Sequence, residues 1–171
     1  MQEDEVQEAE SQVALDYSHW NTPKGGAYWF SSENGEMYQI MRDLEPTLAV
    51  GKRPAKEVDI PSERYLHLSA NNPEIPSNEF SRLTTKLCKV VEEGGDLVLG
   101  GVEYLTTQHG VDQVSKLLKQ LDARAKISTS TILIPVDPSC YESSAWKVLM
   151  QGIPEVPKPT KAAEALYTTS E

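Results

Sequence analysis

The segment from Gly95 to Pro138 constrains the fold more than any other part of the chain. It begins with a short apolar run, Leu97 to Leu99, and a turn follows. An amphipathic segment then extends from Val111 to Ala125, and a largely β-branched run from Thr131 to Val136 comes last. This order predicts strand, loop, helix and strand, which is the repeating unit of a parallel α/β sheet.

The spacing of apolar residues predicts further elements along the chain. Short apolar runs indicate strands at 27–30, 47–50 and 64–68. Amphipathic spacing indicates helices at 37–44, at 80–91 with Ser77 as the N-cap, and at 142–150. We therefore expect a single three-layer α/β domain, with about five mainly parallel strands flanked by helices.

Pro135 lies inside the last predicted strand. Proline has no backbone N–H to give to a neighbouring strand. The sequence therefore predicts that the strand over 131–136 ends at Pro135 or lies at an edge of the sheet.

Charge and proline content divide the chain into three parts. Residues 1–16 hold six acidic residues and no Lys or Arg, so this arm carries −6 of the formal net charge of −10. The α/β domain is expected over 17–151, and a proline-rich tail over 152–171. The arm is either a solubilising tail or a docking arm for a basic partner.

Composition excludes several classes of protein. A net charge of −10 argues against nucleic acid as a partner, because binding to phosphates needs basic residues. No apolar run approaches the roughly 20 residues of a membrane span, and the acidic N-terminus lacks the apolar region of a secretory signal. Two cysteines are too few for a disulfide framework. We expect a cytoplasmic protein.

The patterns that indicate catalysis or cofactor binding are missing. The loop from Ser31 to Glu36 has a single glycine and no lysine, whereas a phosphate-binding loop needs several glycines and a lysine. His19, His67 and His109 do not have the spacing of metal ligands, and no G-x-S-x-G turn occurs. We therefore assign no catalytic residue, no metal and no cofactor, and we do not expect an enzyme.

The best candidates for a ligand site follow predicted strands. Lys52 and Arg53 come directly after one strand, Gly101 and Glu103 after a second, and Asp137 after a third. Ligands of parallel α/β sheets bind outside the carboxyl ends of the strands, so these residues are candidates for one rim. In the alternative interpretation they form a solvated turn, in which Glu103 caps or orients the chain.

Several short motifs, in order, carry a family resemblance. They are the aromatic strand Tyr28–Phe30, the strand and basic turn Leu48–Pro54, the run Gly101–Leu105 with Gly110-Val111 after it, and Val136–Pro138. From Gly26 to Leu149 the chain resembles the archaeal domain of unknown function 835 family on these motifs.

The resemblance implies a fold and a setting. The fold it implies is a degenerate relative of the RecA-like nucleotide-binding domains, in which the strand Leu97–Leu99 normally ends in a metal-coordinating acid. This chain has Gly100 where the family usually has Asp. Members often sit at the end of multidomain archaeal sensory proteins, which implies signalling or protein interaction.

Two functions are favoured by the sequence, and an enzyme of unrecognised mechanism is a third that stays open. The first is a non-enzymatic protein-interaction or signalling-adaptor module of an archaeal cytosolic system, which binds a protein partner through its tails or its domain surface. The alternative is a small-ligand or nucleotide-binding sensor domain without hydrolysis, which uses the rim of Lys52, Arg53, Gly101, Glu103 and Asp137.

Overall fold

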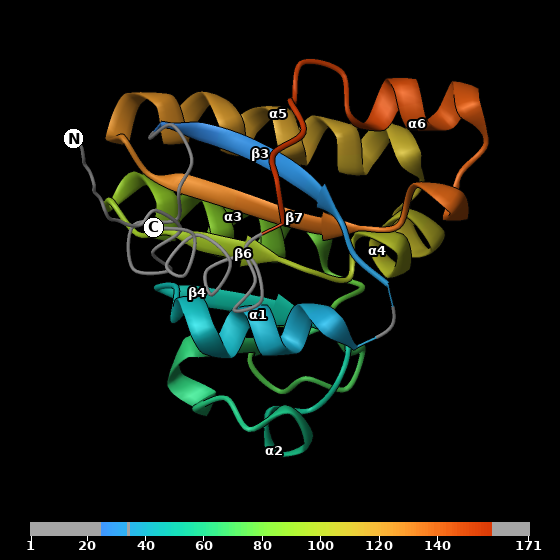
Figure 1. Ribbon diagram of the computed structural model, residues 1–171. Helices are drawn as coiled ribbons and strands as arrows, with labels where there is room; N and C mark the ends of the chain where they lie inside the picture. Colours follow the sequence, from blue (N-terminus) through green and yellow to red (C-terminus); the bar gives the residue numbers. More distant parts are fainter. Residues whose placement is uncertain (1–24, 34, 159–171) are drawn as a thin grey trace, which may run out of the picture.

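A single parallel sheet organises the protein. The computed structural model describes residues 25–33 and 35–158, so the predicted acidic arm lies outside the described residues. The strands are β3 (Gly26–Ser31), β4 (Leu48–Gly51), β5 (Tyr65–His67), β6 (Leu97–Leu99) and β7 (Thr131–Val136). They pair in parallel in the order β3-β7-β6-β4-β5 (Figure 1).

Helices cover both faces of this sheet (Figure 1). One face carries α1 (Glu36–Leu44) and α2 (Ala55–Val58). The other carries α3 (Phe80–Glu92), α4 (Val102–His109), α5 (Val111–Ser128) and α6 (Ser143–Leu149). Two short 3₁₀ turns, η2 (Ser62–Arg64) and η3 (Pro138–Cys140), complete the elements. The predicted three-layer α/β architecture is confirmed, while the RecA-like relationship stays a prediction.

The strands are apolar at almost every position because both faces are buried. Side chains that alternate along the strands divide between two clusters. Val50, Leu66 and Leu99 pack with α3 and α5, whereas Ala49 and Val98 pack with α1. The short apolar runs seen in the sequence are therefore strands of a fully covered sheet.

The prediction of a loop between β6 and the long helix was wrong. Residues 102–109 form α4, which begins after Gly101 at a φ of 75° and ends at Gly110 at a φ of 91°. Only Val102 and Leu105 of this helix are buried, so its apolar stripe is short. Two buried residues in one turn are too few to show helical periodicity in the sequence, so the helix was not predicted.

The prediction from Pro135 was also wrong, because β7 continues through it to Val136 between β3 and β6. Ser32 N donates to Val136 O, so backbone groups at position 136 face β3 and those at 135 face β6. The pairing with β6 ends at Val98 and Leu133. The register places Leu99 O where an N–H at position 135 would donate, so the ladder with β6 stops there because proline has no N–H.

Helix α3 begins three residues after the predicted N-cap. Its N-cap is Glu79, and Ser77 is instead buried in the preceding loop. Ser77 Oγ lies 3.2 Å from Tyr104 Oη, and Ser77 O lies 2.8 Å from His109 Nε2. Ser77 thus ties the loop to α4 rather than starting α3.

The two edges of the sheet differ. At β3, Trp29 N donates to Pro154 O at 3.0 Å and Val156 N donates to Trp29 O at 2.9 Å, so the chain after α6 returns to cover this edge. Ile153 is buried, and Lys158 Nζ pairs with Glu36 Oε2 at 2.9 Å. At the other edge, β5 pairs only with β4 within the described residues.

Candidate functional site

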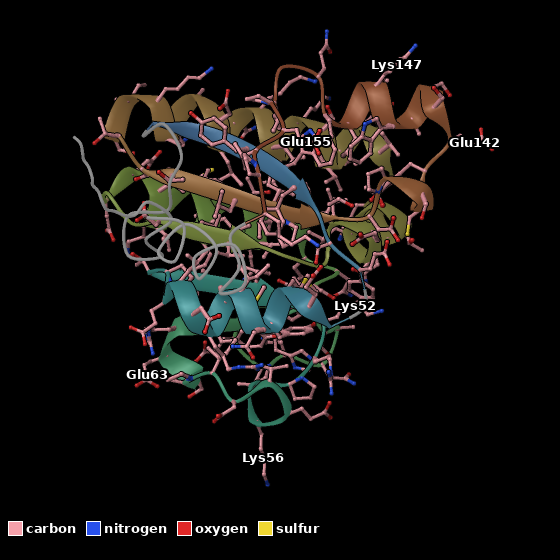
Figure 2. The ribbon with its side chains drawn as sticks, in the orientation of Figure 1. Lys52, Lys56, Glu63, Glu142, Lys147 and Glu155 are labelled. Carbon is pink, nitrogen blue, oxygen red and sulfur yellow. The ribbon has the colours of Figure 1, made fainter. Side chains whose placement is uncertain are left out.

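The structure places the five predicted site residues at the carboxyl edge of the sheet. Lys52 and Arg53 follow β4, Gly101 and Glu103 follow β6, and Asp137 follows β7. Lys52 Nζ lies 5.5 Å from the centre of the Tyr104 ring, and a Cβ on Gly101 would lie 3.9 Å from Lys52 Cγ. Figure 2 shows Lys52 at this end of the sheet. The side chain of Lys52 therefore lies against the start of α4.

Glu103 and Asp137 hold each other in place. Glu103 Oε2 accepts a hydrogen bond of 2.8 Å from Asp137 N. Asp137 Oδ1 accepts from Ser139 Oγ at 2.7 Å and from Ser139 N at 3.0 Å, and these bonds lower the pKa of the Asp137 carboxyl. Glu103 therefore has the orienting role that the alternative interpretation gave it.

Two tyrosines fix the backbone after β4. Tyr38 Oη accepts hydrogen bonds from Lys52 N and Arg53 N, each at 3.2 Å, and Tyr65 Oη donates to Arg53 O. Burial raises the pKa of Tyr65, so its hydroxyl keeps the proton that it donates. A Cβ on Gly51 would lie 2.6 Å from Tyr65 Oη, so only glycine fits. The backbone amides that an anion would need here already have an intramolecular acceptor.

The substitution Tyr38→Phe tests this clamp. Tyr38 is buried, and its loss of the hydroxyl leaves two N–H groups without their acceptor. We expect a loss of about 1–3 kcal/mol in the free energy of unfolding, measured by urea denaturation. Tyr28→Phe is the control, because no hydrogen bond of the Tyr28 hydroxyl occurs within residues 25–33 and 35–158. Equal losses in the two variants would contradict the clamp.

The remaining reactive side chains have local roles. His67 Nε2 lies 2.9 Å from Lys52 O, and no cluster of three His, Cys, Asp or Glu among the described residues could hold a metal ion. Cys88 is buried in α3. Partial burial, and then the charge of Asp137, raises the pKa of the exposed Cys140 thiol. Within the described part of the chain, no helix has the length and apolar character of a membrane span.

A groove in the described part of the chain lies along β5. This groove has a volume of about 720 Å³. It extends from Ser62, before the strand, to Ser69, after it, and Ile75 and Lys86 also line it. A smaller cavity, of about 120 Å³, lies between the end of α1 and Asp59. Neither cavity is lined by the five rim residues.

The loop that walls the groove is held by its own hydrogen bonds. Asn72 Nδ2 donates to His67 O at 2.9 Å, while Asn72 Oδ1 accepts from Glu74 N at 2.9 Å. Ser77 N donates to Ser69 O at 2.9 Å, and Arg82 donates to Glu74 O. The groove is therefore preformed, which lowers the entropic cost of binding.

Two backbone groups of β5 beside this groove have no hydrogen-bond partner among residues 25–33 and 35–158. Leu68 N donates to Gly51 O at 2.8 Å, so by alternation the backbone groups of Tyr65 and His67 point away from β4. Tyr65 N donates to Ser62 O, and His67 O accepts from Asn72. Tyr65 O and His67 N make no hydrogen bond within the described residues. The sequence carries no signal for this site, because Asn71, Asn72 and Pro73 have the composition of an ordinary turn.

Comparison with known proteins supports the family resemblance. A family model described as "Protein of unknown function (DUF835)" matches residues 30–153, which is well over half of the chain. The match spans β4, the groove along β5 and the start of α4. No curated protein matches the chain. The chain therefore belongs to the family of proteins of unknown function DUF835.

Proposed function

We propose that this chain is a non-enzymatic protein-interaction module that binds an extended peptide segment of a partner protein along β5. The observation that carries the proposal is a pair of backbone groups, Tyr65 O and His67 N, that have no partner in the described part of the chain and lie beside a preformed groove of about 720 Å³. An exposed strand edge is a template for another strand, and an added peptide satisfies such groups.

The opposite edge of the same sheet supports this proposal. There the segment after α6 lies along β3, and up to residue 158 its ladder bonds are the two between Trp29 and residues 154 and 156. An extended, proline-containing segment is thus held on this sheet by two backbone hydrogen bonds together with buried side chains. The groups left on β5 offer a partner the same number of bonds.

This function suits a signalling adaptor of an archaeal cytosolic system, the role that the family resemblance implies. Such adaptors recognise short segments of other proteins with modest affinity. The regions beyond the described residues, the acidic arm included, add further candidate contacts for a protein partner.

A matched pair of substitutions tests the proposal. A library of random 12-residue peptides displayed on phage is selected on the full chain, and the enriched peptides are measured against His67→Pro and His67→Ala. Proline removes the outward N–H and is tolerated on edge strands. We expect His67→Pro to weaken binding about tenfold or more, because the peptide carbonyl loses the hydrogen bond that His67 N donates. His67→Ala, which keeps the N–H, is expected to bind within about threefold of the wild type.

The pair also separates folding from binding. Urea denaturation of both variants shows whether either has unfolded, and the imidazole contact to Lys52 O is lost in both. Enriched peptides that bind a folded His67→Pro variant as tightly as the wild type would contradict the proposal, as would a library that yields no peptide.

The alternative, a small-ligand or nucleotide-binding sensor without hydrolysis, would use Lys52, Arg53, Gly101, Glu103 and Asp137. In its favour, the Lys52 side chain lies against the first turn of α4, where a helix attracts anions. Against it, Tyr38 already accepts from the Lys52 and Arg53 amides. A rise in melting temperature with ADP that disappears in Lys52→Ala would favour the sensor.

A further inference from the structure

We infer that the β5 groove selects a peptide that runs parallel to β5 and carries an acidic side chain at the residue opposite Leu66. This inference rests on the peptide-binding function proposed above and gives that peptide a direction and a charge. It is argued from the two unpartnered backbone groups and from the position of Lys86 on the groove wall.

The direction is inferred from the backbone groups that are free within the described residues, together with the parallel pairing of the rest of the sheet. In a parallel pair, one residue donates to the residue before its opposite and accepts from the residue after it. Tyr65 O and His67 N are the acceptor and the donor that a single peptide residue opposite Leu66 requires. An antiparallel strand would use the same two groups through the residues on either side of the one opposite Leu66. The parallel direction is favoured because the segment on the other edge of the sheet, at Glu155, is parallel to β3. The other strands of the sheet are also parallel.

The pairing of the peptide residue with Leu66 also determines on which face of the sheet its side chain lies. A peptide residue opposite Leu66 points its side chain to the same face as Leu66. Leu66 packs in the cluster that contains Leu83 and Leu87 of α3. On this side the groove is lined by Ile75 and by Lys86, the residue before Leu87. The peptide side chain therefore projects toward Lys86.

Lys86 supplies the charge preference. It is exposed on α3 and forms no ion pair within the described part of the chain. The groove also contains two carboxylates, Glu63 and Glu74. Glu63 lies in η2 before β5, at the opposite end of the sheet from Lys52 (Figure 2), and Glu74 lies in the loop after the strand. The carboxylates therefore flank the centre, where an acidic side chain meets Lys86, and they disfavour acids at the ends of the peptide.

A charge reversal tests the side-chain preference. The same phage library is selected on the wild type, on Lys86→Glu and on Lys89→Glu, in which the reversed charge lies on α3 outside the groove. We expect wild-type selection to enrich Asp or Glu at one central position, and Lys86→Glu to enrich Lys or Arg there. A wild-type acidic peptide is expected to lose about tenfold in affinity for Lys86→Glu and to bind Lys89→Glu unchanged.

A spin label on the peptide tests the direction. A label at the amino end of a parallel peptide is expected to broaden amide signals around Glu63, and a label at the carboxyl end those around Asn71. The reverse pattern would overturn the parallel direction.

The outcomes separate this inference from the proposed function. Peptides that depend on the His67 N–H but bind Lys86→Glu and the wild type equally would overturn the acidic preference and leave the binding function standing. Peptides that are insensitive to His67→Pro, or a library without enrichment, would overturn both.

Discussion

The substitution Gly100→Asp is expected to lower the free energy of unfolding by about 3–5 kcal/mol. Gly100 is buried at the end of β6, and its N donates to Val50 O at 2.9 Å. A Cβ at this position would lie 2.7 Å from Met37 Sδ and 2.8 Å from Val50 O. The aspartate would therefore be crowded by backbone and would bury a carboxylate beside a carbonyl oxygen. The family resemblance implied an aspartate at this position.

Urea denaturation of Gly100→Asp and Gly100→Ala measures the two parts of this effect. The alanine variant has the same crowding without the charge, so a loss of about 1–3 kcal/mol is expected. The difference between the variants is the cost of the buried carboxylate. An aspartate variant as stable as the wild type would show that this chain can hold the usual acid, and the sensor alternative would gain support.

Truncation after Gln151 is expected to cost about 3–5 kcal/mol of unfolding free energy. The sequence placed the end of the domain at residue 151, but Ile153 is buried and Val156 packs against the α1 cluster. The two hydrogen bonds between Trp29 and residues 154 and 156 would also be lost. Such a loss is a large part of the 5–15 kcal/mol that stabilises a typical domain.

A truncation after Lys158 is the matched control, because it keeps each of these contacts. The loss is expected in the step from 158 to 151, measured by thermal or urea denaturation of both truncated chains. If the chain that ends at Gln151 were as stable as the chain that ends at Lys158, residues 152–158 would be a tail, as the sequence suggested.

The strands were predictable because burial on both faces leaves a local signal. Each of the runs at 27–30, 47–50 and 131–136 is apolar at nearly every position, and each overlaps a strand. The stripe of Met37, Ile40, Met41 and Leu44 likewise predicted α1. Each of these patterns reflects the contacts that one element makes with the core. The residues that form it are therefore close together in the sequence.

Features that depend on the neighbours of a strand were not predictable. Pro135 suggested an edge because the sequence does not show that β3 pairs with β7 through Val136, on the side where no N–H of residue 135 is needed. The rule that ligands bind outside the carboxyl ends of parallel strands correctly placed Lys52 and Asp137 at one edge of the sheet. It could not predict that the backbone amides of both residues donate hydrogen bonds within the protein. The site along β5 depends on two features of the fold. This strand is last in the sheet order, and Asn72 bonds to His67 O but leaves the His67 N–H free within the described residues.

Amide hydrogen exchange at His67 tests the central claim most directly. In the full chain without peptide, the His67 N–H has no acceptor among the described residues and is expected to exchange quickly, whereas the Leu68 N–H, bonded to Gly51 O, is expected to be protected. With a saturating selected peptide, we expect His67 to become protected and Leu68 to stay so. Unchanged exchange at His67 in a saturated complex would contradict the claim that β5 is the binding edge.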